Sequence, residues 1–373
     1  MKKLAYLATL LLVFLLSCEK SNNDLKQENL SLEEAVDKAA VDINLAVEAI
    51  EQSKAYALFN RELNTKGLSD DDPPALSIQL EDLKGYYVYA PDEENESETF
   101  KQHKAHCNSY FKRIDDSEWF IINLPYQKAI NPSALLSHNA QEEYENNMLI
   151  TTSAYVYERD NSMKWSNYSL ASQFDVDDEY AGNLWVHATV KDYFKSKTHS
   201  KFGFTDEHFM VVETQLSDTI LLRYALEDAD VATLFSEKVV LVVDVKTEMP
   251  HLHFAYELII GDIKIVNAFN ENNQLEYFVY KTDELQEEAI VEIIQSGEGV
   301  ASADLLFMHQ NKDLKITFDD GSSVLLSELL GDSQAVLSEL FNSMKELYLS
   351  QMLINKLAWQ IYKEQICDAE GSE

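Results

Sequence analysis

The chain is poor in the residues that build tight catalytic or phosphate-binding loops. Its 373 residues include 10 glycines, six prolines and three cysteines. It contains no P-loop, no G-x-G-x-x-G turn, no G-x-S-x-G elbow and no H-E-x-x-H zinc helix. Gly297-Glu298-Gly299 lacks the third glycine of a dinucleotide-binding turn. The sequence therefore identifies no particular reaction, and whether the protein is an enzyme stays open.

Basic residues are also scarce, with 30 lysines and arginines against 65 aspartates and glutamates, which gives a net charge of −35. Nucleic-acid binding needs lysine or arginine contacts to phosphates, so we expect no nucleic-acid partner. The same charge repels anionic lipid head groups and favours solubility, cationic partners or divalent cations. A solvated surface with no specific partner would carry the same charge.

The N-terminus has the three parts of a secretory signal. Lys2 and Lys3 precede an apolar run from Leu4 to Leu16, which ends in Ser17 and Cys18. A basic start, a short apolar stretch and a small residue at the cleavage site are typical of a signal peptide. The run is 13 residues long, whereas a membrane-spanning helix needs about 20, so a permanent transmembrane helix is not expected.

The segment Leu15-Leu16-Ser17-Cys18 resembles the lipobox of bacterial lipoproteins. In that family the signal is cut just before the cysteine, which receives a diacylglyceryl thioether and usually an N-acyl chain such as palmitate. The resemblance implies a signal peptide at 1–17, lipidation of Cys18, and a tether at 18–30. Two or three acyl chains anchor a protein stably. The expected location is the extracytoplasmic side of a bacterial membrane, preferably the outer one, with the membrane itself as a partner through Cys18.

Two cysteines remain once Cys18 is lipidated, and loss of Lys2 and Lys3 with the signal takes the net charge to −37. Cys107 and Cys367 are compatible with one disulfide in an oxidising compartment or with two free thiols. The resemblance covers about 20 residues and implies nothing about the body.

The body is predicted to be α+β, because its hydrophobic period changes twice. Ser31-Leu32-Glu33-Glu34 is a capping box that opens an N-terminal helix over 31–66. The Ala- and Val-rich stripe of this helix suits close packing. From about residue 75 to 330 apolar residues alternate, which predicts a large, mainly antiparallel β-sheet with meander connections. Within this region we predict a short helix over 97–113, a strand over 183–194 and hairpin turns at 270–273 and 319–322. The segment 283–295 fits either a strand or a helix face. The segments 168–194 and 254–280 share a rhythm that would fit two similar sheet halves. A long helix over 334–367 closes the chain.

Two clusters have residue types that bind metals. His103, His106 and Cys107 share one helix face and suit zinc or copper. A polar face beside a buried cysteine is the alternative. The second cluster gathers oxygen ligands suited to calcium: Asp175, Asp177, Asp178 and Glu179. Its spacing is not that of an EF-hand, and a charged turn is the alternative. His251 and His253 lie on one side of a predicted strand. We predict no cofactor.

Three functions from different classes remain open. The first is non-catalytic binding or assembly in the cell envelope, with a protein, glycan or lipid as ligand, and a flat aromatic patch would favour it. The second is a carrier of lipid or lipoprotein, which needs an apolar cavity under a curved sheet. The third is a hydrolase, which needs a cleft with convergent polar residues. Nineteen tyrosines and four tryptophans are available for the first.

Overall fold

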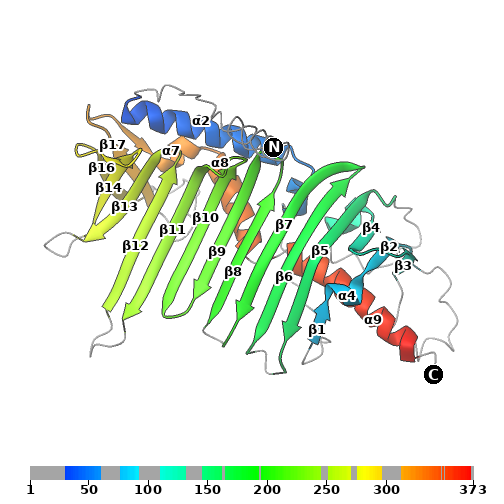
Figure 1. Ribbon diagram of the computed structural model, residues 1–373. Helices are drawn as coiled ribbons and strands as arrows, with labels where there is room; N and C mark the ends of the chain where they lie inside the picture. Colours follow the sequence, from blue (N-terminus) through cyan, green and yellow to red (C-terminus); the bar gives the residue numbers. More distant parts are fainter. Residues whose placement is uncertain are drawn as a thin grey trace, which may run out of the picture.

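The computed structural model describes residues 30–59, 76–91, 110–131, 145–161, 164–192, 195–244, 251–269, 275–295, 312–345, 347 and 349–370. Within them, the predicted α+β fold is confirmed: a sheet of 15 strands dominates, and helices lie along it (Figure 1). The segments 168–194 and 254–280, considered as two similar halves, belong to this one continuous sheet.

The large sheet is a meander in which most strands pair with their sequence neighbours. Its strands are β1 (Leu76–Gln79), β2 (Gly85–Tyr89), β3 (Phe111–Asp115), β4 (Phe120–Leu124), β5 (Met148–Arg159), β6 (Ser166–Val176), β7 (Glu179–Val190), β8 (Ser196–Gly203), β9 (His208–Leu216), β10 (Thr219–Asp228), β11 (Thr233–Asp244), β12 (His251–Ile260), β13 (Ile263–Phe269), β14 (Leu275–Lys281) and β15 (Glu284–Leu285). The order runs from β15 down to β4, then β2 and β3, and β1 pairs with β5. All described pairs are antiparallel except the parallel pair β2–β4.

Three further strands form a separate small sheet: β16 (Ile290–Gln295), β17 (Lys312–Thr317) and β18 (Ser323–Leu325). The predicted turn at 319–322 joins β17 to β18. Gly321 has a φ of 85°, which glycine adopts without strain, and the Phe318 N–H donates to the carbonyl of Ser322. The predicted turn at 270–273 lies outside the described residues.

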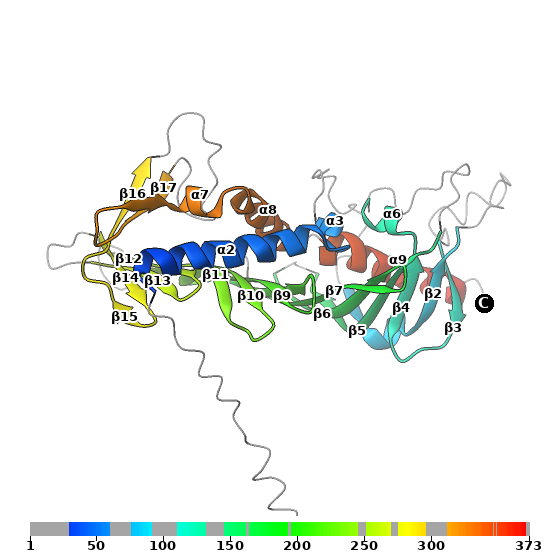
Figure 2. The same cartoon turned by 90° about the horizontal axis from the view of Figure 1, so that it is seen from above.

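One face of the large sheet is covered by helices, and we call it the covered face (Figure 2). The helices of the chain are α2 (Leu32–Glu51), α3 (Tyr56–Phe59), α4 (Leu80–Leu83), α6 (Tyr126–Ala129), α7 (Leu326–Leu330), α8 (Ser333–Lys345), the π-helix η2 (Leu349–Asn355) and α9 (Lys356–Glu370). Among them, α2, α8 and α9 run along the covered face, where Phe341 of α8 lies 4.9 Å from the Tyr224 ring. The opposite face, which α2, α8 and α9 leave uncovered, we call the open face.

The N-terminal helix begins as predicted and ends earlier. Ser31 Oγ accepts from the Glu34 N–H, while the Glu34 carboxylate accepts from the Ser31 N–H. The small residues predicted to pack closely do so, since a Cβ added at Gly261 would meet Ala39 Cβ at 2.8 Å. The helix stops at Glu51 instead of continuing to 66, and the Ser53 hydroxyl donates to the Ile50 carbonyl. Residues 60–66 lie outside the description.

The C-terminal segment is not the single helix predicted for 334–367. It begins at Ser333 and breaks after Lys345, and Leu347 has a positive φ of 54°. The π-helix η2 follows before α9 continues to Glu370. The Tyr155 hydroxyl of β5 donates to Asn355 Oδ1 at 3.0 Å, so contacts with the sheet accompany the break.

Two stretches were assigned to the wrong structure. The strand predicted over 183–194 occupies 179–190, and the next strand, β8, was missed. Phe111–Asp115 form the edge strand β3, although the helix predicted over 97–113 included their first three residues. The rest of that predicted helix lies outside the description. The ambiguous segment 283–295 forms β15 and β16.

Candidate functional site

Three of the four tryptophans are exposed, and all three lie on the open face. The exposed fractions are 46% for Trp119, 41% for Trp165 and 39% for Trp185. Trp185 lies between the buried residues Leu184 and Val186 of β7, so its side chain points away from the covered face. Trp119 and Trp165 immediately precede β4 and β6, where the same alternation places them on the open face. The fourth, Trp359, packs against the core in α9.

The strand register aligns two of these indoles across the sheet. Ala154 pairs with Ala171, and Ala171 pairs with Trp185. Trp119 lies beside the bulge in β5 that ends at Ala154, because Phe120 pairs with Thr152. We call Trp119, Ala154, Ala171 and Trp185 the tryptophan row. Its two indoles are three strand spacings apart, roughly 14 Å. The residues between them are small: Ala171 on β6, and Ala154 with the bulge residue Ser153 on β5.

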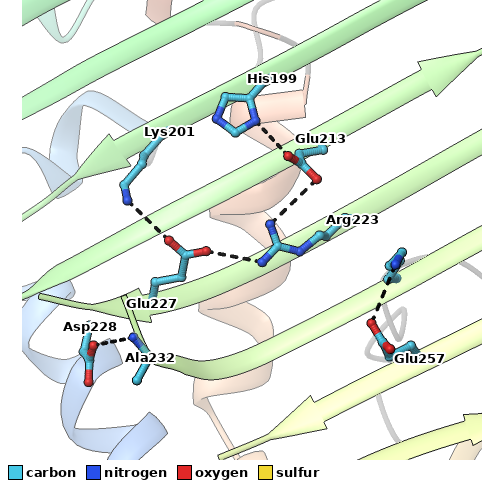
Figure 3. Close-up of polar contacts among 9 residues, drawn as sticks. His199, Lys201, Glu213, Arg223, Glu227, Asp228, Ala232 and Glu257 are labelled. Carbon is cyan, nitrogen blue, oxygen red and sulfur yellow. Dashed lines mark hydrogen bonds and ion pairs between the residues drawn. The ribbon is translucent and has the colours of Figure 1, made fainter. Parts of the chain in front are cut away.

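A second row of side chains crosses the open face over β7 to β12, two residues away along the strands from Trp185. Figure 3 shows members of this row from His199 to Glu257. Each member is the cross-strand partner of the next. In order, this polar row consists of His187, His199, Glu213, Arg223, Lys238 and Glu257. Opposite charges on neighbouring strands stabilise a sheet face.

The charged groups of this face neutralise one another in pairs. Glu227, whose side chain is 9% exposed, lies 3.3 Å from Lys201 Nζ and 3.2 Å from Arg223. Arg223 also lies 3.7 Å from Glu213, which interacts with His199 Nδ1 at 3.0 Å. Lys201 Nζ additionally lies 4.5 Å from the centre of the Phe209 ring. On a protein of net charge −35, this part of the surface carries balanced charge.

Replacing Arg223 tests how strongly this network holds the sheet. We expect Arg223→Gln to lower the free energy of unfolding by about 1–3 kcal/mol, because nearly buried Glu227 keeps only Lys201 as a charged partner. The matched control, Lys238→Gln, breaks a 3.8 Å pair with Glu257 whose side chains are more than one-third exposed, and should cost under about 1 kcal/mol. Urea unfolding measures both. Equal, small losses would show that the network contributes little.

The acidic cluster of Asp175, Asp177, Asp178 and Glu179, for which the sequence left calcium binding and a charged turn open, lies at the β6–β7 turn. Asp177 and Asp178 adopt positive φ there. Lys54 Nζ lies 3.5 Å from Asp177 and 2.8 Å from Glu179, while Asp175 accepts hydrogen bonds from Gln173. Within the described ranges, no group of three or more His, Cys, Asp or Glu side chains is arranged to hold a metal ion.

Several other predicted residues lie partly or wholly outside the description. They are Cys18, His103, His106 and Cys107. Cys367 belongs to α9, and His251 pairs with Asp244 across β11 and β12, but the description does not extend to their side chains. His253 is exposed on the open face. Among the candidate ligands in the described part, Asp177 and Glu179 converge on Lys54 Nζ, a cation of the chain itself.

Sequence reasoning missed both rows. Trp185 and His187, like His199 and Lys201, are two residues apart, which is the signal that each pair shares one side of a strand. The rows exist only through the register of up to six strands. The spacing of residues along the chain does not reveal how the strands pair. The sequence therefore could not predict which side chains lie next to one another across the sheet.

On the covered face, the described residues enclose one small hollow. A hollow between β7, β8 and the α8–η2 junction has room for about one water molecule. Among the described carboxyl groups, the one with the largest pKa shift also faces this side of the sheet. Glu237 of β11 is fully buried, and burial raises its pKa to about 7. It lies in the core, with no open cleft around it.

No protein-family model matches the chain, and neither the curated proteins nor the solved structures provided a match. In the described part, none of the helices combines the length and the apolar character that a membrane span requires.

Proposed function

We propose that this protein is a lipid-anchored, non-catalytic binding protein of the bacterial cell envelope, and that the open face is its binding surface. The observation that carries the proposal is the gathering of three exposed indoles on the face that α2, α8 and α9 leave uncovered. Exposed aromatic groups on a flat, rigid surface are typical of recognition sites, because they bring a large contact area at little entropic cost.

The two alternatives receive less support from the described residues. A lipid carrier needs an apolar cavity, whereas the hollow between the sheet and α8 holds about one water molecule. A hydrolase needs convergent polar groups in a cleft, whereas the carboxyl with the raised pKa, Glu237, lies in the core. Binding of a partner on the open face, in contrast, accounts for the exposure of the tryptophans.

Anchoring through Cys18 follows from the lipobox resemblance and completes the proposal. An acylated Cys18 would hold the body close to a membrane, since the 12 residues from Glu19 to Leu30 reach at most about 40 Å. The binding surface would then sample ligands of the envelope, whether protein, glycan or lipid.

Site-specific photo-crosslinking on intact cells tests the binding surface. A photoreactive residue replaces Gln173, which is exposed on the open face next to the tryptophan row. We expect a crosslinked product with an envelope component, because the partner covers this position. The matched control places the same group at Glu48, an exposed position on α2, and should give none.

Equal crosslinking from both positions, or none from Gln173, would contradict the binding surface.

The Cys18→Ala chain, which cannot be lipidated, tests the anchor. It is fractionated in parallel and should no longer be recovered with the membranes; its recovery with them would contradict the anchor. Hydrolysis of ester, peptide or glycoside substrates by the purified protein, abolished by one carboxylate substitution, would favour the enzyme instead.

A further inference from the structure

The tryptophan row sets small side chains between two large exposed ones, and we call the strip between the two indoles the trough. Trp119 and Trp185 are exposed at its two ends, and Ala154 and Ala171 form the floor between them. Side chains of one methyl group on the floor leave the indole faces accessible from the sides. Large residues between the indoles would instead block access to the indole faces.

The trough is bordered by groups that form hydrogen bonds without carrying a fixed charge. Ser169 and Gln173 lie two residues on either side of Ala171, and Asn183 and His187 lie two residues on either side of Trp185. Alternation puts all four on the open face. Hydroxyl, amide and imidazole groups donate and accept hydrogen bonds in the plane of a ligand lying over the indoles.

The charge around the trough favours a neutral ligand over an acidic one. Lys201, the cross-strand partner of Trp185, is already paired with Glu227. At the other end, Lys84 precedes Gly85, whose N–H donates to the Trp119 carbonyl, and it lies 3.5 Å from Glu81. Both cations next to the row are therefore already paired with a carboxylate. The chain as a whole, at net −35, repels anionic polymers. A neutral ligand needs no counter-charge at the trough and is not repelled by the negative charge of the chain.

From this geometry we infer that the tryptophan row binds a neutral polysaccharide, whose sugar rings stack on Trp119 and Trp185 while the chain crosses β4 to β7. A pyranose ring presents an apolar C–H face to an indole and hydroxyls at its rim to the amides and imidazole beside the trough. The separation of roughly 14 Å between the indoles suits several linked sugars and is too long for one. This inference rests on the proposed function, for which it names the ligand class.

Affinity electrophoresis of the full-length protein in detergent tests the inference. Native gels contain laminarin, amylopectin, galactomannan or xyloglucan as neutral polysaccharides, or polygalacturonate as an acidic one. We expect at least one neutral polymer to retard the protein. Trp119→Ala and Trp185→Ala should each weaken that binding at least about tenfold, since an aromatic anchor at the centre of a contact carries most of its energy. Trp185→Phe should restore part of it.

Trp165→Ala is the matched control. Trp165 has the same residue type, face and exposure, but lies six residues along β6 from the row, roughly 20 Å, so its loss should change binding less than about twofold. Urea unfolding of every variant confirms that the fold is intact.

Retardation by polygalacturonate alone, by no polymer, or equally for wild-type and both tryptophan variants would overturn the inference. If the crosslink from the Gln173 position forms while no polymer binds, the open face is a binding surface for another class of ligand. If that crosslink fails as well, the proposed function itself is wrong.

Discussion

A chain that ends at Asp332 is expected to aggregate and to lose cooperative unfolding. The deletion removes α8, η2 and α9, whose apolar side chains fill the covered face. The buried members are Leu337, Leu340, Phe341, Met344, Leu347, Leu349, Leu353, Ile354, Leu357, Ala358 and Ile361. Each fully buried large side chain contributes about 1.5–3 kcal/mol, so the loss is of the order of the whole stability of a domain, about 5–15 kcal/mol.

The uncovered surface gives the mechanism of aggregation. Tyr155, Tyr168 and Tyr224, all buried in the complete chain, would face solvent on a wide sheet. Size-exclusion chromatography and binding of a hydrophobic dye measure the outcome. A chain ending at Glu370, which keeps all of α9, is the control and should remain monomeric. A truncated chain that stays monomeric and unfolds cooperatively would show that the sheet needs no C-terminal cover.

Local signals in the sequence predicted the parts of the fold that local physics determines. The capping box at Ser31 and Glu34 forms as expected, because both hydrogen bonds join residues three apart. The alternation of apolar residues predicted a large antiparallel sheet, because a sheet with one solvated face repeats every two residues. Both predictions concern interactions between neighbours along the chain.

The errors occur where tertiary contacts decide. No glycine or proline lies near Leu347 to predict the helix break there. There, the Ser350 hydroxyl donates to the Leu347 carbonyl, and Asn355 accepts from Tyr155 of the sheet. Strand β8 was missed because its residues facing the covered side include Thr198 and Ser200, so its sequence lacks apolar alternation. The tryptophan row and the polar row depend on the register across several strands, which cannot be read from a single sequence.

Glu237 is expected to make the protein less stable as the pH rises from about 4.5 to 8. Its side chain points into the covered face from β11, where its cross-strand partners are the buried residues Tyr224 of β10 and Leu258 of β12. Neither carboxylate oxygen makes a hydrogen bond of good geometry within the described residues. Above it, α2 and α8 bury no charged side chain in the described structure, so no counter-charge faces it.

The direction of the pH effect follows from the pKa of this carboxyl. Burial raises it from 4.5 to about 7, and the hydroxyl of Tyr256 offsets only part of that rise. Because the folded-state pKa exceeds the unfolded one, the contribution of Glu237 to stability is full below about pH 4.5 and is lost as the pH rises through 7. A difference of this size corresponds to about 3 kcal/mol.

Glu237→Gln isolates this term, because the amide has nearly the same shape and never ionises. We expect the variant to match the wild type at pH 4.5 and to exceed its free energy of unfolding by about 3 kcal/mol at pH 8. Urea unfolding across this range measures the difference. Glu257→Gln, which removes a carboxylate from the open face of the adjacent strand, is the matched control and should show no comparable gain between the two pH values. A Glu237→Gln effect that is the same at both would mean that this carboxylate is ionised, or solvated, in the folded protein throughout.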